Sequence, residues 1–264
     1  MDAPISNNST ILKVDDISLS FGGVHALSEV SFEIATNEIG SIIGPNGAGK
    51  SSMLNVLNGV YRPHKGIITF NGRSKEHWTP RKVAKQGVGR TFQNIALFKG
   101  MTALENIQTG RCLMNRASFL NQAFRLPKSR REDIQSREKA EELLEFLEIQ
   151  AIRKTSVGQL SYGLQKRIEL GRALAAEPKL LFLDEPMAGM SLEEKQDMTR
   201  FILQAKDAYK MTVILIEHDL GVVMDISDHV IVLDYGKKIA DGTPDQVKKD
   251  HRVIDAYVGR NTDI

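Results

Sequence analysis

A glycine-rich octapeptide, GPNGAGKS at residues 44–51, restricts the possible folds of this chain more than any other segment does. An apolar run at Ile39–Ile43 precedes it, and a segment with helical character, Ser51–Leu57, follows it. Between a strand and a helix, the spacing G-x-x-x-x-G-K-[ST] lets the backbone curl until its N–H groups point inward, beside the positive end of the helix. Such a curl binds phosphate groups. The octapeptide therefore predicts an α/β fold that holds the phosphates of a nucleotide.

Individual residues of this loop have distinct predicted roles. The Lys50 ammonium is expected to reach the β and γ phosphates and to act in catalysis, and the Ser51 hydroxyl is expected to be a ligand of Mg²⁺. The alternative is a glycine-rich turn without a ligand, and the order of strand, loop and helix argues against it. The residues predicted to bind the nucleotide here are Gly44, Asn46, Gly47, Gly49, Lys50, Ser51 and Ser52.

Two carboxylates follow a second apolar run, Leu180–Leu183. An acidic side chain at the end of a buried strand can hold magnesium through water, and a carboxylate beside it can orient and polarise an attacking water. Phosphoryl transfer needs such charge neutralisation and positioning more than it needs covalent help from the protein. We therefore predict that Asp184 binds the metal and that Glu185 is the catalytic residue that activates water.

The composition excludes several classes of protein. The chain has 264 residues, 41% of them apolar and 26% charged, which is an ordinary globular mixture. No apolar run exceeds four residues, whereas a membrane-spanning helix needs about 20, and the first residues do not have the pattern of a signal peptide. The single cysteine, Cys112, excludes intrachain disulfides and cysteine-based zinc clusters. A net charge of +2 argues against a nucleic-acid partner, and we expect a cytoplasmic location.

Apolar periodicity predicts three regions along the chain. Alternating residues dominate the first seventy positions, which indicates strands joined by tight turns. Arg130–Ile149 has the pattern of an amphipathic helix, whose predicted buried face comprises Ile134, Ala140, Leu143, Leu144 and Leu147. Apolar runs at Leu180–Leu183, Val213–Ile216 and Val230–Leu233 are typical of parallel strands covered on both faces. Near the end, turn residues delimit a hairpin strand, and Thr243, Pro244 and Gln246 predict the start of a last helix.

A second motif, QLSYGLQ at Gln159–Gln165, opens a predicted helix with Ser161 as its N-cap. The pattern L-S-x-G-x-Q, about twenty residues before the Asp-Glu pair, resembles the signature of ABC-type ATPases, and the resemblance extends over nearly the whole chain. It implies that Ser161, Gly163 and Gln165 face the γ-phosphate of an ATP bound by the opposite subunit, so that two subunits sandwich two ATP molecules.

The same resemblance assigns roles to three further residues. His218, after the run VILIE, matches a switch histidine that contacts the γ-phosphate and acts in catalysis. Gln93, in GRTFQ, matches the glutamine that binds the nucleotide and metal and links them to the inserted helices, and Phe21 matches the aromatic residue that stacks on adenine. Ser191 departs from the family pattern because a carboxylate or amide often stands there, which leaves the strength of coupling between the two ATP sites open.

The resemblance also implies a domain organisation. We predict a P-loop ABC ATPase of the α/β class over 1–264, with a mostly parallel sheet core, an N-terminal antiparallel β subdomain and an inserted helical subdomain. Residues 1–100 and 161–264 are expected to form the nucleotide-binding core with its antiparallel edge, and 101–160 the insertion. ATP and Mg²⁺ are the implied cofactors.

Since no membrane span is predicted, the expected partners include integral membrane permease subunits, which place the chain peripherally on the inner face of the cell membrane. A second ABC ATPase subunit, identical or related, is also implied, and a periplasmic binding protein is an indirect partner. Some of Ile95, Leu97 and Phe98 are predicted to face a groove for a helix of the permease, and burial under the helical lobe is the alternative.

The segments FGGVHAL, GVGRTFQNIALF and DAYVG resemble ATPases of branched-chain amino acid importers. Importers of urea or short amides and the ATPase of lipopolysaccharide export share much of this pattern. A soluble scaffold ATPase of the same family is a further alternative. Because the permease and the binding protein select the cargo, these residues favour branched-chain amino acids without fixing them.

Overall fold

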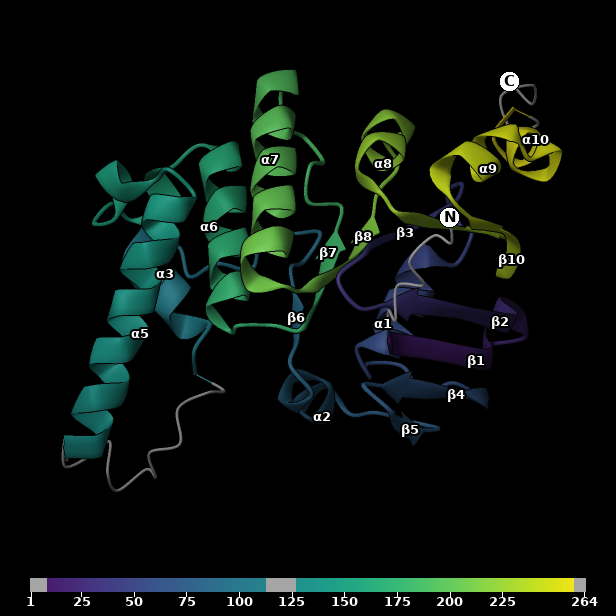
Figure 1. Cartoon of the computed structure of the whole chain (residues 1–264), viewed down its shortest axis with the longest axis horizontal. Helices are drawn as coiled ribbons and strands as arrows, with labels where there is room; N and C mark the ends of the chain where they lie inside the picture. Colours follow the sequence, from purple (N-terminus) through teal and green to yellow (C-terminus); the bar gives the residue numbers. More distant parts are fainter. Residues whose placement is uncertain (1–8, 113–126, 259–264) are drawn as a thin grey trace, which may run out of the picture. The chain divides into compact units, whose positions relative to one another are not determined.

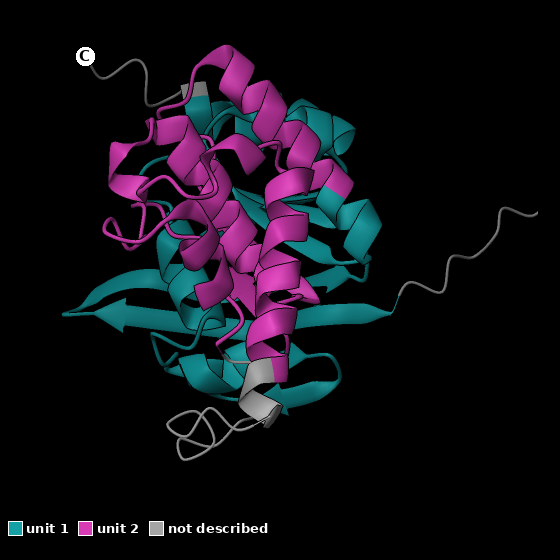
Figure 2. Ribbon diagram, turned by 90° about the vertical axis from the view of Figure 1, so that its left-hand side faces the viewer, with its two compact units in different colours: residues 1–86, 205–264 teal, residues 87–204 magenta. Residues whose placement is uncertain are grey.

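The computed structural model describes residues 9–112 and 127–258, which form two compact units (Figure 1). Unit 1 comprises residues 1–86 and 205–264, and unit 2 comprises residues 87–204 (Figure 2). In this division, residues 87–100 and 161–204 group with the helical segment. The predicted boundaries of the inserted subdomain, 101–160, stay a prediction.

Unit 1 contains an antiparallel sheet in the strand order β2-β1-β4-β5. Along β1 the side chains alternate between the protein interior and solvent, with Leu12 and Val14 buried, as the period of two in the sequence predicts. Val14 pairs with Phe32 on one side and with Ile68 on the other. The strands are β1 (Thr10–Phe21), β2 (Val24–Ala35), β4 (Lys65–Phe70) and β5 (Arg73–Lys75).

Parallel strands form the second sheet of unit 1. β3 (Ile39–Ile43) pairs in parallel with β8 (Thr212–Ile216) and with β9 (His229–Asp234), and β10 (Lys237–Gly242) pairs antiparallel with β9. All residues of β3 and β8 are buried, which is typical of parallel strands covered on both faces. The apolar runs in the sequence therefore predicted these strands correctly, and the hairpin strand after β9 is confirmed.

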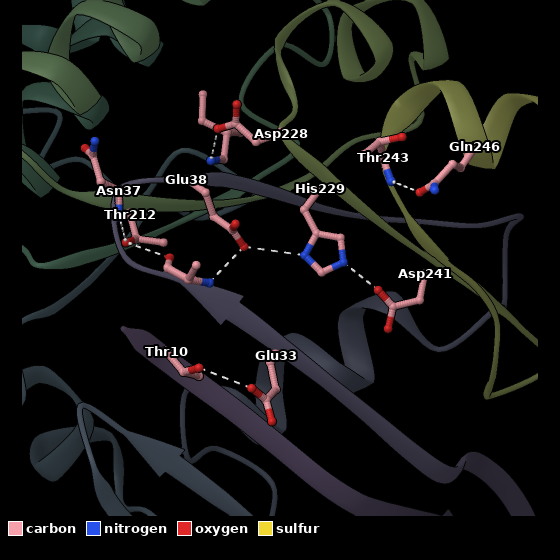
Figure 3. Close-up of polar contacts among 12 residues, drawn as sticks. Thr10, Glu33, Asn37, Glu38, Thr212, Asp228, His229, Asp241, Thr243 and Gln246 are labelled. Carbon is pink, nitrogen blue, oxygen red and sulfur yellow. Dashed lines mark hydrogen bonds and ion pairs between the residues drawn. The ribbon is translucent and has the colours of Figure 1, made fainter. Parts of the chain in front are cut away.

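Side chains at the start of β3 link this strand to its neighbours (Figure 3). The Glu38 carboxylate accepts a hydrogen bond from the Ala35 N–H at 2.9 Å and lies 3.4 Å from Nδ1 of His229 on β9. The other ring nitrogen of His229 contacts the Asp241 carboxylate on β10. A chain of polar contacts therefore joins the β2–β3 connection to β9 and β10, at the end of β3 that lies away from the glycine-rich loop.

Short helices complete unit 1. The last predicted helix, α9, begins at Pro244, and the Gln246 side chain accepts a hydrogen bond from the Thr243 N–H at 2.9 Å, as the sequence predicts. A further helix, α10, follows it and was not predicted. The helices are α1 (Lys50–Leu57), α2 (Pro80–Lys85), α8 (Leu220–Ile226), α9 (Pro244–Lys249) and α10 (His251–Val258).

Unit 2 combines a parallel strand pair with helices. β6 (Val88–Arg90) pairs in parallel with β7 (Leu180–Asp184), whose five residues are all buried. Two 3₁₀ turns, Gln150–Ile152 and Val157–Gln159, lead into α6. The helices are α3 (Ala103–Thr109), α5 (Pro127–Phe146), α6 (Tyr162–Ala175) and α7 (Leu192–Tyr209), of which α7 ends in unit 1.

The amphipathic helix predicted over Arg130–Ile149 is present as α5. Ala140, Leu143, Leu144 and Leu147 are buried as predicted, but Ile134 is 56% exposed, so its predicted burial is wrong. Within 131–146, the part of α5 whose burial is described, the buried positions begin at Ser136, two residues after Ile134. No helix within 9–112 and 127–258 has the length and apolar character that crossing a bilayer requires.

Candidate functional site

The glycine-rich loop of unit 1 connects β3 to α1. Gly44 has φ +150°, and a Cβ atom there would lie 2.1 Å from the backbone oxygen of Leu233. Gly47 and Gly49 have φ values of +80° and +105°, in the left-handed region that side chains disfavour. The backbone curl predicted from the octapeptide therefore requires glycine at these three positions.

Lys50 is the first residue of α1 and is 8% exposed. Its ammonium donates hydrogen bonds to the backbone oxygens of Gly44, at 2.7 Å, and Pro45, at 3.0 Å. The charge is thus held against the loop, while the neighbouring Ser51 is exposed. No acidic side chain lies in the first turn of α1, so the positive end of this helix is left for an anion.

Phe21, predicted to stack on adenine, lies at the end of β1 and is 46% exposed. Its ring makes an edge contact with the ring of Tyr61, with 5.1 Å between the centroids. This contact holds one edge of the Phe21 ring and leaves much of the side chain open to solvent. Nothing in the sequence pattern indicated Tyr61 as the supporting residue.

The two carboxylates of unit 2 lie at the end of β7, with Asp184 as its last residue and Glu185 directly after it, and both have partners. Asp184 is 7% exposed and forms an ion pair with Arg90, with 3.1 Å between Nη2 and Oδ2. Burial raises the pKa of Asp184, while the hydrogen bond from Arg90 acts in the opposite direction. Arg90 was not predicted, because an arginine three positions before Gln93 has no distinguishing pattern in the sequence.

Glu185, the next residue, has a left-handed backbone with φ +47°, which is uncommon for a residue with a side chain. Its Oε2 accepts a hydrogen bond from the Gln93 side-chain amide at 3.1 Å. Two residues assigned from separate motifs, Gln93 and Glu185, therefore meet within unit 2. Strained backbone of this kind clusters at active sites.

The signature segment of unit 2 caps α6 as predicted. Ser161 is exposed, and its hydroxyl accepts from the Leu164 N–H at 3.5 Å. Gly163 is buried, and a Cβ atom there would lie 2.1 Å from Oε1 of Glu194. The Gln165 side chain donates to the backbone oxygen of Leu160 at 2.8 Å, so it stiffens the segment that precedes the helix.

Ser191, the departure from the family pattern, has a structural role in unit 2. Its hydroxyl accepts from the Glu194 N–H at 3.2 Å, and its own N–H donates to the Glu194 carboxylate at 2.9 Å. These two bonds form a capping box at the start of α7. The same Glu194 carboxylate lies beside Gly163, so the cap of α7 adjoins the signature segment.

His218, the predicted switch histidine of unit 1, follows β8, and its side chain is 61% exposed. Its backbone N–H donates to the Glu217 carboxylate at 3.2 Å, and ring Nδ1 lies 3.7 Å from the same oxygen. Glu217 is 1% exposed. A buried carboxylate thus anchors the residue, whose ring remains accessible.

The predicted magnesium ligands have suitable chemistry. The Ser51 hydroxyl, the Gln93 amide and the Asp184 carboxylate supply hard oxygen atoms, which Mg²⁺ prefers. Among the described residues, no group of three or more His, Cys, Asp or Glu side chains could hold a metal by itself. Mg²⁺ commonly binds through one or two carboxylates together with the phosphates of a substrate.

These features are those of a phosphate-loop nucleotide-binding protein: a buried parallel strand, a glycine-rich loop that holds a lysine, and a helix start without acidic groups. The pair of carboxylates at a strand end is suited to hydrolysis of the bound nucleotide. Residues 27–188 match the ABC transporter family, and the chain belongs to this family. Residues 237–262 match the branched-chain amino acid ATP-binding cassette transporter family.

Proteins of known function with similar sequences are transport ATPases. The high-affinity branched-chain amino acid transport ATP-binding protein BraF of Pseudomonas aeruginosa is 39% identical over 249 residues, 94% of this chain and 98% of that protein. The corresponding protein LivG of Escherichia coli strain K12 is 34% identical over the same shares. The chain is accordingly an ATP-binding subunit of an ABC transporter, whose ATP hydrolysis is coupled to transport.

Solved structures agree with this assignment. A nucleotide-free ATP-binding cassette from an ABC transporter has a TM-score of 0.82 and 32% identity, over 94% of this chain and 99% of that chain. The ADP conformation of an ATP-binding cassette also has a TM-score of 0.82, with 34% identity over 95% of this chain and 99% of that chain. The α/β fold of this family, with parallel and antiparallel sheets and helices, is confirmed.

Proposed function

We propose that this chain powers an importer of branched-chain amino acids. The proposed cargo rests on the match of residues 237–262, from β10 through α10, to the branched-chain family. The phosphate loop and the signature do not indicate the cargo, because they are common to ABC ATPases of any cargo. Identities of 39% and 34% to BraF and LivG over 94% of the chain support the same cargo.

The geometry of the glycine-rich loop supports the proposed nucleotide contacts of unit 1. When ATP binds, the N–H groups of the loop and the Lys50 ammonium bind the β and γ phosphates, and Phe21 stacks on adenine. Lys50 must then exchange its bonds to the Gly44 and Pro45 oxygens for bonds to phosphate. Because the phosphate oxygens carry full charge, these bonds are stronger than those to neutral carbonyl groups.

The proposed hydrolytic residues of unit 2 act on the attacking water. Glu185 accepts a proton from this water, and the Gln93 amide holds the carboxylate in place. Mg²⁺, with Ser51, Asp184 and Gln93 as protein ligands, neutralises phosphate charge when bound. Burial raises the pKa of Asp184, and the hydrogen bond from the Arg90 guanidinium opposes this rise. His218 is proposed to contact the γ-phosphate and report its loss.

The proposed working unit is a pair of ABC ATPase subunits. Ser161, Gly163 and Gln165 of one subunit face the γ-phosphate held by the other, which suits a helix start with an exposed serine. Hydrogen bonds to charged groups contribute roughly 1.5–3 kcal/mol each, so two at each of two sites amount to roughly 6–12 kcal/mol. About 5.5 kcal/mol moves an equilibrium from 1:99 to 99:1, so ATP binding and γ-phosphate loss can close and open the pair.

The proposed partners are integral membrane permease subunits, which hold the chain on the cytoplasmic face of the membrane, with a periplasmic binding protein as an indirect partner. The segment 95–98 supplies the contact. Phe98 is 53% exposed, and Ile95 and Leu97 are partly exposed, so part of the predicted surface is open in the isolated chain.

Transport by a reconstituted complex tests this function. The chain is co-expressed with the permease genes of its source and with its second ATPase, purified by a tag on this chain and placed in liposomes. We expect ATP-driven uptake of leucine, isoleucine or valine in the presence of the periplasmic binding protein, and loss of uptake with Lys50→Ala. Purification without any membrane protein, or uptake of urea or amides alone, would contradict the proposal.

A further inference from the structure

Three charged side chains lie on one face of α6, the helix that the signature segment opens. Lys166, Glu169 and Arg172 follow one another at intervals of three residues, so they occupy adjacent turns. The side chains of Lys166 and Glu169 are 2% and 1% exposed, and that of Arg172 is 15% exposed. Burying charge costs free energy unless partners compensate it, and the proposed function assigns these residues no role.

Their partners are backbone groups of one loop, residues 92–96, which contains Gln93. The Lys166 ammonium donates to the oxygens of Phe92, at 3.3 Å, and Gln93, at 3.0 Å. Glu169 Oε1 accepts from the N–H groups of Phe92 and Ala96, both at 3.4 Å. Arg172 donates to the Ala96 oxygen at 2.5 Å. One helix face therefore holds both ends of this loop through charged groups.

The three side chains also balance one another. Glu169 Oε2 lies 3.6 Å from the Lys166 ammonium, and Oε1 lies 3.9 Å from the Arg172 guanidinium. Oε2 has no hydrogen-bond partner among the described residues, so the two cations compensate its charge. Burial raises the pKa of Glu169, and Lys166 acts against this rise. Forming this buried cluster therefore costs free energy, and the hydrogen bonds that its side chains make to other described residues all end on the loop 92–96.

The loop leads directly to the proposed hydrolytic carboxylate. Lys166 binds the backbone oxygen of Gln93, and the Gln93 side chain donates to Glu185 at 3.1 Å. In the other direction, Lys166 lies one turn after Tyr162 in the signature segment, and its ammonium is 5.8 Å from the centre of the Tyr162 ring. Two bonds therefore connect Lys166 to Glu185, and one helical turn connects it to the signature.

We propose that Lys166, supported by Glu169 and Arg172, is a positioning residue for ATP hydrolysis: it fixes the Gln93 backbone so that the Gln93 amide keeps Glu185 oriented, and it makes this loop and the start of α6 move as one body. This inference rests on the proposed function of Glu185. It requires that the cluster affect turnover and leave nucleotide affinity alone, because the phosphate loop lies in unit 1. A cluster that only stabilised unit 2 would have no such selectivity.

The double variant Lys166→Met/Glu169→Gln tests this proposal, since it removes both charges and leaves no lone buried ion. The matched control is Lys139→Met/Glu142→Gln, which removes another Lys–Glu pair at the same spacing, 2.7 Å apart on α5. We expect kcat for ATP to fall roughly 10- to 100-fold with KM within about 2-fold, as for a misplaced catalytic group. The control variant should keep the wild-type kcat and KM. The single variant Lys166→Arg, which keeps the positive charge, should retain most of the wild-type kcat.

A double-mutant cycle with Gln93→Ala tests whether Lys166 acts on Glu185 through Gln93. If Lys166 acts through Gln93, adding the double variant to Gln93→Ala lowers kcat no more than about 2-fold further. Multiplicative losses, or an unchanged kcat in the folded double variant, would overturn the proposal. If the double variant does not fold, Arg172→Lys replaces it. This variant keeps a positive charge beside Glu169 but its shorter side chain no longer reaches the Ala96 oxygen, so it should lower kcat and leave KM unchanged. Wild-type protein without ATPase activity would instead refute the proposed function.

Discussion

Glu185 occupies a backbone position that few side chains adopt, with φ +47° immediately after the buried strand β7. The turn directs its carboxylate to the Gln93 amide, and Gln93 is in turn held by Lys166. A carboxylate that a hydrogen bond holds in one orientation can stay directed at the water from which it must take a proton. The geometry of Glu185 therefore suits proton acceptance from water.

Replacing Glu185 by glutamine should separate binding from hydrolysis. Glu185→Gln retains the shape of the side chain but removes its basicity, so we expect ATP hydrolysis to fall by roughly 10²–10⁴-fold. The dissociation constant of ATP should stay within about 2-fold, because the phosphate loop is untouched. Phosphate release and equilibrium nucleotide binding measure the two effects.

A neighbouring glutamate supplies the control for this experiment. Glu193 is exposed in the first turn of α7, so Glu193→Gln should leave both hydrolysis and binding unchanged. If Glu185→Gln hydrolysed ATP at the wild-type rate, the role assigned to this carboxylate would be wrong.

Single residues were predictable to different degrees. Roles could be predicted for Gly44, Lys50 and Glu185 because these predictions depend on sequence spacing within one strand–loop–helix unit or at one strand end. Arg90, Tyr61 and Lys166 could not, because each acts through a partner far away in the sequence, such as Asp184 for Arg90. A pattern confined to one segment carries no signal for such pairs.

Among secondary-structure elements, the buried strands were predicted most reliably. Apolar runs of four residues are typical of strands in a covered parallel sheet, and β7, β8 and β9 appear where these runs place them. β3 appears at the largely apolar segment before the glycine-rich loop. Helices at the periphery were harder to predict. α10 has only eight residues, and Ile134 of α5 is exposed although the apolar pattern places it on the buried face.

The contact of three strands at His229 predicts a pH-dependent stability. The hydrogen bond with Asp241, and then that with Glu38, raises the pKa of His229 from 6.5 to about 9 (Figure 3). A group whose pKa is higher in the folded than in the unfolded protein stabilises the fold fully at pH values below its unfolded-state pKa. This stabilisation is lost as the pH rises through its folded-state pKa. The contribution should therefore disappear between pH 6.5 and about 9.

Thermal unfolding at several pH values measures this effect. The rise in pKa corresponds to at most about 3 kcal/mol, so wild-type Tm should fall by several degrees from pH 6.5 to 9.5 relative to His229→Gln. His251→Gln, at an exposed residue of α10, is the control and should follow the wild type. Parallel Tm curves for the wild type and His229→Gln would show that the bridge does not stabilise unit 1.

The start of α6 supports a prediction about the pairing of subunits. Ser161 is exposed and caps this helix, so Ser161→Arg adds a bulky cation where the γ-phosphate of the opposite subunit is proposed to bind. We expect nucleotide affinity to be retained and ATP-driven dimerisation to be lost, as measured by light scattering in the Glu185→Gln background. Lys154→Ala, before the signature segment, is the control. Normal dimers of Ser161→Arg would contradict the sandwich arrangement.

At the scale of the whole molecule, an ATPase that powers transport must pass force to a membrane partner. The segment from Phe98 to Thr102 has a firmly held backbone, as such a contact requires. Asn106, which is 0% exposed, accepts from the Phe98 N–H at 2.8 Å and donates to the oxygens of Phe98 and Thr102, both at 3.0 Å. The backbone is therefore fixed while the Phe98 side chain is 53% exposed. An apolar ring on a rigid support is typical of an interface anchor.

Substituting this ring should uncouple transport from hydrolysis. We expect Phe98→Asp to leave the ATPase activity of the isolated chain within about 2-fold, because Asn106 still holds the backbone, and to abolish co-purification with the permease, because a buried unpaired carboxylate costs several kcal/mol at an interface. Ile134→Asp is the matched control, since Ile134 is also apolar and 56% exposed in unit 2. A Phe98→Asp chain that still recovered the permease and drove leucine uptake would place the docking surface elsewhere. The clamp of Lys166, Glu169 and Arg172 on loop 92–96 would then connect the signature helix to Glu185 without connecting it to the partner.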